Sequence, residues 1–218
     1  MPGRPLPRGG PRRQAGNHQP LRARWRAYAD PRSADGKDWY GTWAQFRKDV
    51  AGGPFKASDR FLVVGCGSSS VPADLVADGF VDVTGMDYSE KAIALQKRRF
   101  PGINWVRADA RSMPEFANSS FDVLIEKALM DGEGAWKQWP QMLSEYSRVL
   151  RYGGRFISIS LGQPDELDSE AFFANDTYGW DVRHALSYDD YYVYTMTKRR
   201  KLGRRLRRRR RPAGSPEL

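Results

Sequence analysis

The sequence is poor in the residues that form disulfides or bind metal ions. Its 218 residues include one cysteine and two histidines, which excludes a disulfide framework and a cysteine-rich zinc site and argues against a metal-centred active site. It also lacks any run of about 18 apolar residues, so no membrane-spanning helix is expected. Because 40% of the residues are hydrophobic and seven are tryptophan, the chain can still bury the core of one domain.

Acidic residues are missing from two stretches near the ends of the chain. Residues 1–26 contain seven arginines, and residues 198–211 contain eleven lysines and arginines. The intervening residues 27–197 hold 18 basic and 25 acidic residues, a net charge near −7. The formal charge of +10 therefore describes an acidic body with two basic ends, not a body with a nucleic-acid-binding face.

Composition also divides the chain into three parts. Residues 1–22 are rich in Pro, Gly and Arg and are expected to be disordered, residues 23–197 to form the domain, and residues 198–218 to be a disordered Arg-rich tail. Such a tail could contact RNA or the ribosome, or serve as a nuclear signal. The N-terminal stretch is Arg-rich and acid-free like a mitochondrial transit peptide, but its prolines oppose an amphipathic helix. We expect a cytoplasmic protein, with the nucleus and the mitochondrion as alternatives.

Short β-rich runs alternate with helical segments through the body. This alternation predicts an α/β domain with a Rossmann-like, mostly parallel sheet, helices on both faces and an antiparallel C-terminal edge. We expect the tripeptide Tyr152-Gly153-Gly154 to break the chain before the fifth strand. The seven predicted strands are 60–64, 81–86, 104–107, 121–125, 155–160, 178–185 and 190–197, and the predicted helices are 71–77, 89–99 and 139–150.

Chemistry-bearing residues follow the first three predicted strands. Gly65-Cys66-Gly67 follows the first, where glycines let backbone N–H groups approach a ligand. Asp87 ends the second, where an acid can receive two ribose hydroxyls, and Asp109-Ala110 follows the third, where a carboxylate can accept from an adenine amine. The third glycine of the dinucleotide fingerprint is replaced by serines 68–70, which disfavours NAD and FAD.

Each of these residues also has a structural alternative. Asp87 could instead be the N-cap of the next helix, although Ser89 could fill that role. Cys66 is interpreted as a loop-packing residue, because no histidine lies near it in sequence. His184 is interpreted as a structural strand residue.

The motifs together resemble the class I S-adenosylmethionine-dependent methyltransferases. More narrowly, they are similar to the lysine methyltransferases of the methyltransferase-like group, above all those acting on elongation factor 1-alpha, with the citrate synthase enzyme more distant. The resemblance implies S-adenosyl-L-methionine as cofactor and a protein substrate presenting a lysine, with no metal and no membrane. The cofactor-binding residues it implies, together with the glycine loop, are Tyr28, Trp39, Gly65, Cys66, Gly67, Asp87, Tyr88, Asp109, Ala110 and Lys127.

The chain departs from this family at two places. Arg24 stands where the family has a tryptophan in an N-terminal lid helix, with Trp25 displaced by one position. Residues 128–131 read Ala-Leu-Met-Asp where the family usually has Gly-Thr-Leu-Asp.

Methyl transfer from a sulfonium is an in-line displacement that needs positioning and exclusion of water. A lysine acceptor must also lose a proton, since its free pKa is about 10.4. Glu126 and Asp131 follow the fourth strand and are the candidates for steering or deprotonating the ammonium; alternatively, Glu126 pairs with Lys127 or caps nearby backbone. Two other functions stay open: a small-molecule methyltransferase, and a weakened family member that binds RNA or ribosomes.

Overall fold

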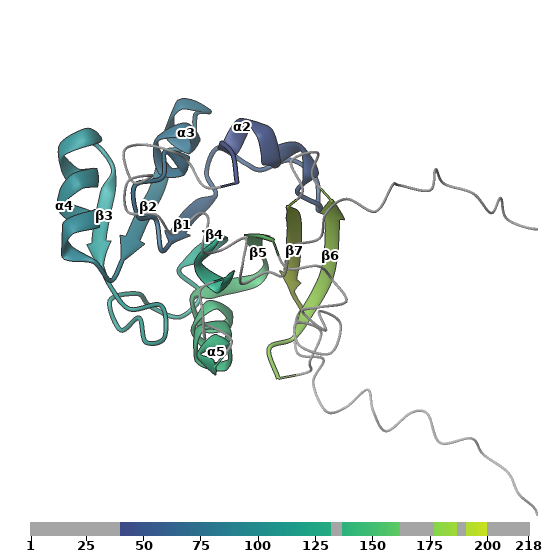
Figure 1. The fold of residues 1–218 in the computed structure, drawn as a ribbon. Coiled ribbons are helices and arrows are strands. Elements are labelled where there is room, and N and C mark those ends of the chain that lie inside the picture. Colours follow the sequence, from purple (N-terminus) through teal and green to yellow (C-terminus); the bar gives the residue numbers. More distant parts are fainter. Residues whose placement is uncertain (1–39, 132–136, 162–176, 187–190, 200–218) are drawn as a thin grey trace, which may run out of the picture.

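The computed structural model describes residues 40–131, 137–161, 177–186 and 191–199, and its elements are shown in Figure 1. The predicted N-terminal stretch, Tyr28, Trp39 and the tail beyond Arg199 lie outside the described residues. The strands are β1 (Arg60–Val64), β2 (Asp82–Asp87), β3 (Asn104–Arg107), β4 (Phe121–Lys127), β5 (Leu150–Ser160), β6 (Trp180–Leu186) and β7 (Tyr192–Lys198). The helices are α2 (Trp43–Phe46), α3 (Val71–Ala77), α4 (Glu90–Arg99) and α5 (Trp139–Val149), with the 3₁₀ turns η2 (Arg47–Asp49) and η3 (Leu129–Asp131).

The seven strands form one mixed sheet in the order β3-β2-β1-β4-β5-β7-β6. The strands from β3 to β5 run parallel, whereas β7 pairs antiparallel with both β5 and β6. The predicted α/β architecture with an antiparallel C-terminal edge is therefore confirmed. The strand order reverses at β1, between β2 and β4, and ligands of open α/β sheets bind beside the carboxyl ends of strands at such a point.

Two hydrophobic layers hold the helices against the sheet. The helices α2, α3 and α4 lie on one side of the sheet and α5 on the other (Figure 1). Successive side chains of β1 enter opposite layers: Phe61 and Val63 pack on the first side, and Leu62 and Val64 on the side of α5. A strand buried on both faces reads as a continuous apolar run, which is why residues 60–64 were recognisable in the sequence.

The predicted break before the fifth strand is wrong, because β5 runs without interruption from Leu150 to Ser160. A Cβ at Gly154 would lie 2.9 Å from the carbonyl oxygens of Asp122 and Arg151. The register between β4 and β5 shifts between Phe121 and Val123. The glycine pair thus accommodates a local irregularity of a continuous strand, as glycine in strands often does.

Lys198 belongs to the folded domain rather than to the tail. It is the last residue of β7, and its Nζ donates to the carbonyls of Ser147 and Leu150, the latter at 2.6 Å. Arg199 still donates from its backbone to the carbonyl of Gly179. The sequence placed the boundary at residue 198 because it reads there as the start of a charge run.

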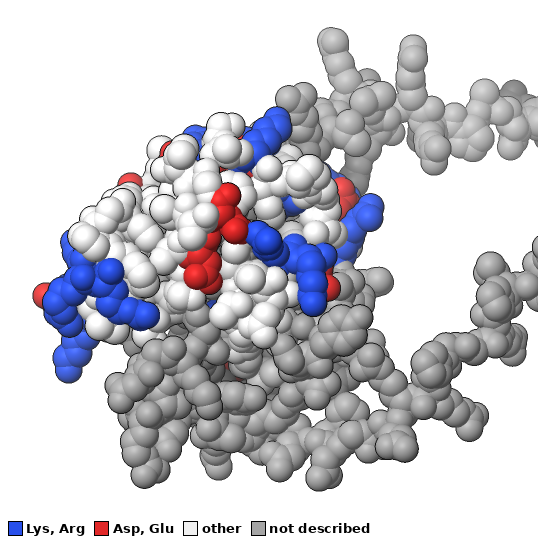
Figure 2. All heavy atoms as spheres, turned by 90° about the horizontal axis from the view of Figure 1, so that it is seen from above, with Lys and Arg blue, Asp and Glu red and all other residues white. Residues whose placement is uncertain are grey.

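One cluster of basic residues on the surface is explained by its position at the end of a helix. Lys97, Arg98 and Arg99 occupy the last turn of α4, where cations interact favourably with the helix dipole. Figure 2 shows basic side chains at the end of the molecule where α4 lies. No helix among the described residues is long and apolar enough to cross a membrane.

Candidate functional site

The glycine loop after β1 adopts a backbone conformation that favours glycine at two positions. Gly65 and Gly67 have φ angles of 63° and 48°, in the left-handed region. A Cβ at Gly65 would also lie 2.9 Å from Leu129 Cδ2, whereas the space beside Gly67 is open. The loop therefore brings its backbone close to η3 while leaving room for a ligand.

Asp87, at the end of β2, fastens this loop to the start of α4. Its side chain accepts from the backbone N–H of Gly67 at 2.9 Å through Oδ2 and from that of Ser89 at 2.8 Å through Oδ1. The N-cap of α4 is Ser89, whose hydroxyl accepts from the N–H of Ala92. Each carboxylate oxygen of Asp87 keeps further lone-pair capacity, so the group can still receive two hydroxyls of a ligand.

Gln96 is a loop-positioning residue that the sequence analysis missed. It lies fully buried on α4, and its Nε2 donates to the carbonyl of Gly67 at 3.1 Å and to that of Ser69 at 2.8 Å. Its helical spacing from Ile93 places it on the buried face of α4, which is the signal that could have identified it. Gln96 thus fastens the glycine loop to α4.

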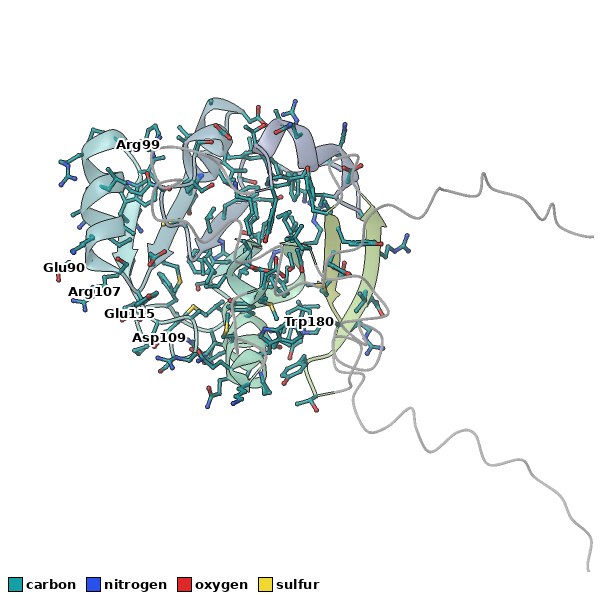
Figure 3. All side chains as sticks on the ribbon, in the orientation of Figure 1. Glu90, Arg99, Arg107, Asp109, Glu115 and Trp180 are labelled. Carbon is teal, nitrogen blue, oxygen red and sulfur yellow. The ribbon has the colours of Figure 1, made fainter. Side chains whose placement is uncertain are left out.

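Asp109 is paired with an arginine that the sequence analysis did not single out. Both of its carboxylate oxygens accept from the guanidinium of Arg111, at 2.5–3.0 Å. These hydrogen bonds lower the pKa of Asp109. Figure 3 shows Asp109 on the loop that follows β3. An adenine amine at this position would meet a carboxylate already oriented by Arg111.

Two adjoining cavities follow the carboxyl ends of the strands. The first, of about 390 Å³, lies along the glycine loop and the ends of β1 and β4 and includes Cys66, Lys127 and Ala128. The second, of about 300 Å³, contains Asp87, Asp109 and Ala110. Gly65, Tyr88 and Leu129 border both, and Tyr88 is 74% exposed. The two together suit an elongated ligand that crosses Gly65.

Lys127 connects the first cavity to the segment before α2. Its Nζ donates to the carbonyl of Gly41 at 2.9 Å. Tyr40 and Gly41 both have positive φ angles, 59° and 93°. Lys127 therefore holds this turn beside the cavity that it lines, and the predicted contacts of Tyr28 and Trp39 lie outside the described residues.

Glu126 is fully buried and contacts the backbone of η3. Its Oε2 accepts from the N–H groups of Leu129 at 3.0 Å and Met130 at 3.3 Å, and its Oε1 accepts from the hydroxyl of Ser158. Burial, and next the charge of Asp131, raises the pKa of Glu126 to about 8. These contacts favour the capping alternative, so a catalytic role for Glu126 stays a prediction.

Asp131, at the end of η3, is buried beside the same strand ends. Its carboxylate accepts from the hydroxyl of Ser160 and from the N–H of Leu161 at 3.1 Å. Burial raises its pKa as well. Both predicted candidates for steering or deprotonating the ammonium, Glu126 and Asp131, are buried, and among the described residues neither borders the two cavities. Their catalytic role stays a prediction.

Two candidates with alternative interpretations are also located. Cys66 is buried, and burial followed by the charge of Asp87 raises the pKa of its thiol to about 12, which disfavours a thiolate nucleophile. His184 lies in β6, opposite Tyr194 in the strand register, and its side chain lies outside the described residues. No group of metal-binding side chains occurs in the described ranges.

Alanine at position 128, where the family usually has glycine, is expected to lower the stability of the fold. Ala128 has a φ of 65°, a left-handed conformation in which a side chain costs about 1–2 kcal/mol. We expect Ala128→Gly to raise the free energy of unfolding by about 1 kcal/mol in urea titrations, since relief of this strain exceeds the added entropy of glycine. The matched control is Ala94→Gly within α4, which should lower it by about 1 kcal/mol. Equal destabilisation by both changes would show that the backbone at Ala128 is not strained.

Comparisons with known proteins agree with this geometry. Residues 62–158 match the family described as "Methyltransferase domain". The chain is 34% identical over 183 residues to EEF1A lysine methyltransferase 4 of Bos taurus, covering 76% of this chain and 70% of that protein. It is 32% identical over 170 residues to the eEF1A lysine and N-terminal methyltransferase of Homo sapiens, covering 73% of this chain but only 24% of that protein.

Solved structures support the fold. A TehB-like SAM-dependent methyltransferase from Corynebacterium glutamicum has a TM-score of 0.57 at 22% identity, covering 82% of this chain and 96% of that chain. A SAM-dependent methyltransferase from Methanosarcina mazei has a TM-score of 0.54 at 19% identity, covering 66% of this chain and 94% of that chain. At these identities the likeness shows the fold alone.

Proposed function

Because this chain belongs to the S-adenosylmethionine-dependent methyltransferases, we propose that it methylates a lysine side chain of a protein substrate of the elongation factor 1-alpha type. The similarity to EEF1A lysine methyltransferase 4 over most of both chains is the observation that carries this proposal. Because one fold serves many different reactions, the identity of the acceptor decides the function.

The residues of the site fit S-adenosylmethionine, whose sulfonium supplies an activated methyl group. We assign the ribose hydroxyls to Asp87, because its two oxygens keep free lone pairs at the border of the second cavity. Asp109 lies in the same cavity and would accept from the adenine amine. The open space beside Gly67 and the bend at Gly65 leave the first cavity for the amino-acid part.

The acceptor side is supported by Asp131, which is buried at the end of η3, and by the apolar wall of the first cavity. The charge of Asp131 attracts an approaching ammonium, whereas the raised pKa of Glu126, about 8, leaves that group largely protonated at neutral pH. A lysine must arrive neutral at the methyl group, and the apolar wall of Ile125, Ala128 and Leu129 disfavours its charged form by desolvation. The chain's contribution is thus to attract the ammonium, desolvate it and exclude water.

The full-length protein should transfer a labelled methyl group from S-adenosylmethionine to purified elongation factor 1-alpha. Mass spectrometry of tryptic peptides would locate the methylated lysine, and acceptor protein with its lysines blocked by prior acetylation is the negative control. Label that appears only in small molecules of a cell extract would instead favour a small-molecule methyltransferase. Absence of any transfer, together with absence of cofactor binding, would favour the weakened, non-catalytic alternative.

A further inference from the structure

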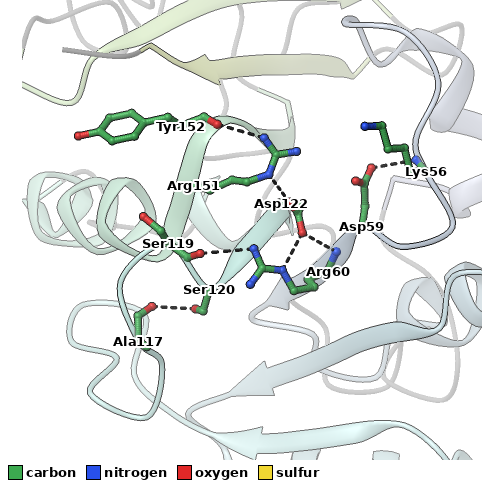
Figure 4. A network of polar contacts seen from close by, with 9 residues as sticks. All are labelled: Lys56, Asp59, Arg60, Ala117, Ser119, Ser120, Asp122, Arg151 and Tyr152. Carbon is green, nitrogen blue, oxygen red and sulfur yellow. Dashed lines mark hydrogen bonds and ion pairs between the residues drawn. The ribbon is translucent and has the colours of Figure 1, made fainter.

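A third cavity, lined by polar residues, lies at the edge of the sheet opposite the two cofactor cavities. It has a volume of about 240 Å³ and is bordered by the loop before β1, the amino end of β4, and parts of β5 and β7. Figure 4 shows the polar contacts around it. Its lining residues include Lys56, Asp59, Asp122, Arg151 and Arg155.

Asp122 already forms ion pairs with two arginines. It accepts from the backbone N–H of Arg60 at 2.9 Å and from the Nε of Arg60 at 2.8 Å, and it accepts also from the Nε of Arg151. Although burial alone would raise it, these hydrogen bonds lower the pKa of Asp122 to about 2. The carboxylate therefore stays charged and cannot compensate a further cation.

Arg155 brings a poorly hydrated cation to the same cavity. It is only 9% exposed, and its guanidinium lies 3.8 Å from the centre of the Phe55 ring. Its Nη1 donates to the carbonyls of Ala51 at 3.3 Å and Gly53 at 2.8 Å. Among the described residues these are the only hydrogen bonds of the Arg155 guanidinium, so the donors on its Nε and Nη2 remain available.

The cations exceed the anions around this cavity. The backbone N–H of Lys56 donates to Asp59 at 2.9 Å, which leaves the Lys56 ammonium without a contact in the described part of the chain. Three cationic side chains, those of Lys56, Arg151 and Arg155, line the cavity together with two carboxylates, those of Asp59 and Asp122. An excess of positive charge in a partly enclosed site attracts an anion. An arginine guanidinium can bind a phosphate group through two parallel N–H···O hydrogen bonds.

We propose that this cavity binds a small phosphate group, either the free ion or a small phosphate monoester. Its volume of about 240 Å³ falls below the roughly 300–1,000 Å³ of sites for drug-sized ligands and suits a group of the size of phosphate. Of the three cations that line it, Lys56 and Arg151 are accessible to solvent, whereas Arg155 is buried. The proposal does not rest on methyl transfer, because the cavity lies at the other edge of the sheet from the cofactor site.

The test is thermal unfolding of the full-length protein in increasing inorganic phosphate, with ionic strength held constant by sodium chloride. A ligand that binds only the folded state raises the midpoint with a saturating dependence on concentration. Lys56→Gln keeps the backbone bond to Asp59 and should weaken phosphate binding by about tenfold or more, and Arg151→Gln likewise. The control is Arg98→Gln on α4, which removes one surface charge and should bind phosphate like the unaltered protein.

The basic residues after Arg199 also attract phosphate, but they are present in every variant. A rise of equal size in all four proteins would therefore assign the effect to them and overturn the proposal, as would the absence of any rise. Glycerol phosphate distinguishes the two sources of the group. Tighter binding than inorganic phosphate identifies a monoester as the ligand, and weaker binding identifies the free ion.

Discussion

Asp87→Ala is expected to weaken S-adenosylmethionine binding at least tenfold in isothermal titration calorimetry. Hydrogen bonds from hydroxyls to a carboxylate are charge-assisted and contribute about 1.5–3 kcal/mol each. The variant also leaves the N–H groups of Gly67 and Ser89 without their acceptor. We therefore expect the free energy of unfolding to fall by about 1–3 kcal/mol as well.

Two controls separate the ligand contact from the loop contact. Asp82→Ala removes a carboxylate from the other end of β2, where the side chain is exposed, and should leave affinity unchanged. Gln96→Leu loosens the glycine loop without touching Asp87 and should reduce affinity less than Asp87→Ala does. If Asp87→Ala binds the cofactor as tightly as the unaltered protein, Asp87 is not part of the site.

Glu126→Ala is expected to lower the free energy of unfolding by about 3 kcal/mol or more. The change removes the acceptor of two backbone N–H groups in η3 and of the Ser158 hydroxyl, all of them buried or partly buried. Glu126→Gln keeps a carbonyl for the η3 backbone and can donate to Ser158, so it should fold. Chemical unfolding of the two variants side by side measures the difference.

The pH dependence of stability provides a separate readout of Glu126. Its folded pKa of about 8 exceeds its ordinary value of 4.5, so between these values the folded chain holds a proton that the unfolded chain has lost. Stability therefore falls as the pH rises through this window, by about 1.4 kcal/mol per pH unit from this group. Glu126→Gln should flatten the fall, and an unchanged slope would assign it to other groups such as Asp131.

The rate of methyl transfer by Glu126→Gln distinguishes two roles of Glu126, capping of the η3 backbone and general-base catalysis. A general base contributes about 10²–10⁴-fold to a rate, so a loss of that size with intact cofactor binding would make Glu126 the base. Because its oxygens face the backbone of η3 and Ser158, we expect a smaller loss. The sequence placed Glu126 near the chemistry, but it could not show which groups its carboxylate meets.

The sequence by itself determined the sheet and the cofactor edge. A buried strand such as Arg60–Val64 is a continuous apolar run, Gly65 follows that strand directly, and Asp87 is the last residue of the next one. Local pattern and position were therefore sufficient. The same reasoning was wrong at Gly154, which lies inside β5 and does not end it. A Cβ at this position would lie 2.9 Å from the carbonyl oxygens of Asp122 and Arg151, so the packing of the strand favours glycine. Local propensity cannot anticipate contacts from the neighbouring strand.

Only the tertiary structure decided which polar groups meet. Gln96 reaches Gly67 across 29 positions, Glu126 meets Ser158 across 32, and Arg155 meets the carbonyl of Gly53 across 102. Hydrogen bonds depend on distances of about 3 Å and on direction, which residue order does not specify for groups on different elements. The cofactor edge could be predicted because parallel strands bring their ends together, whereas the buried carboxylates and the phosphate-sized cavity emerge only once the elements pack.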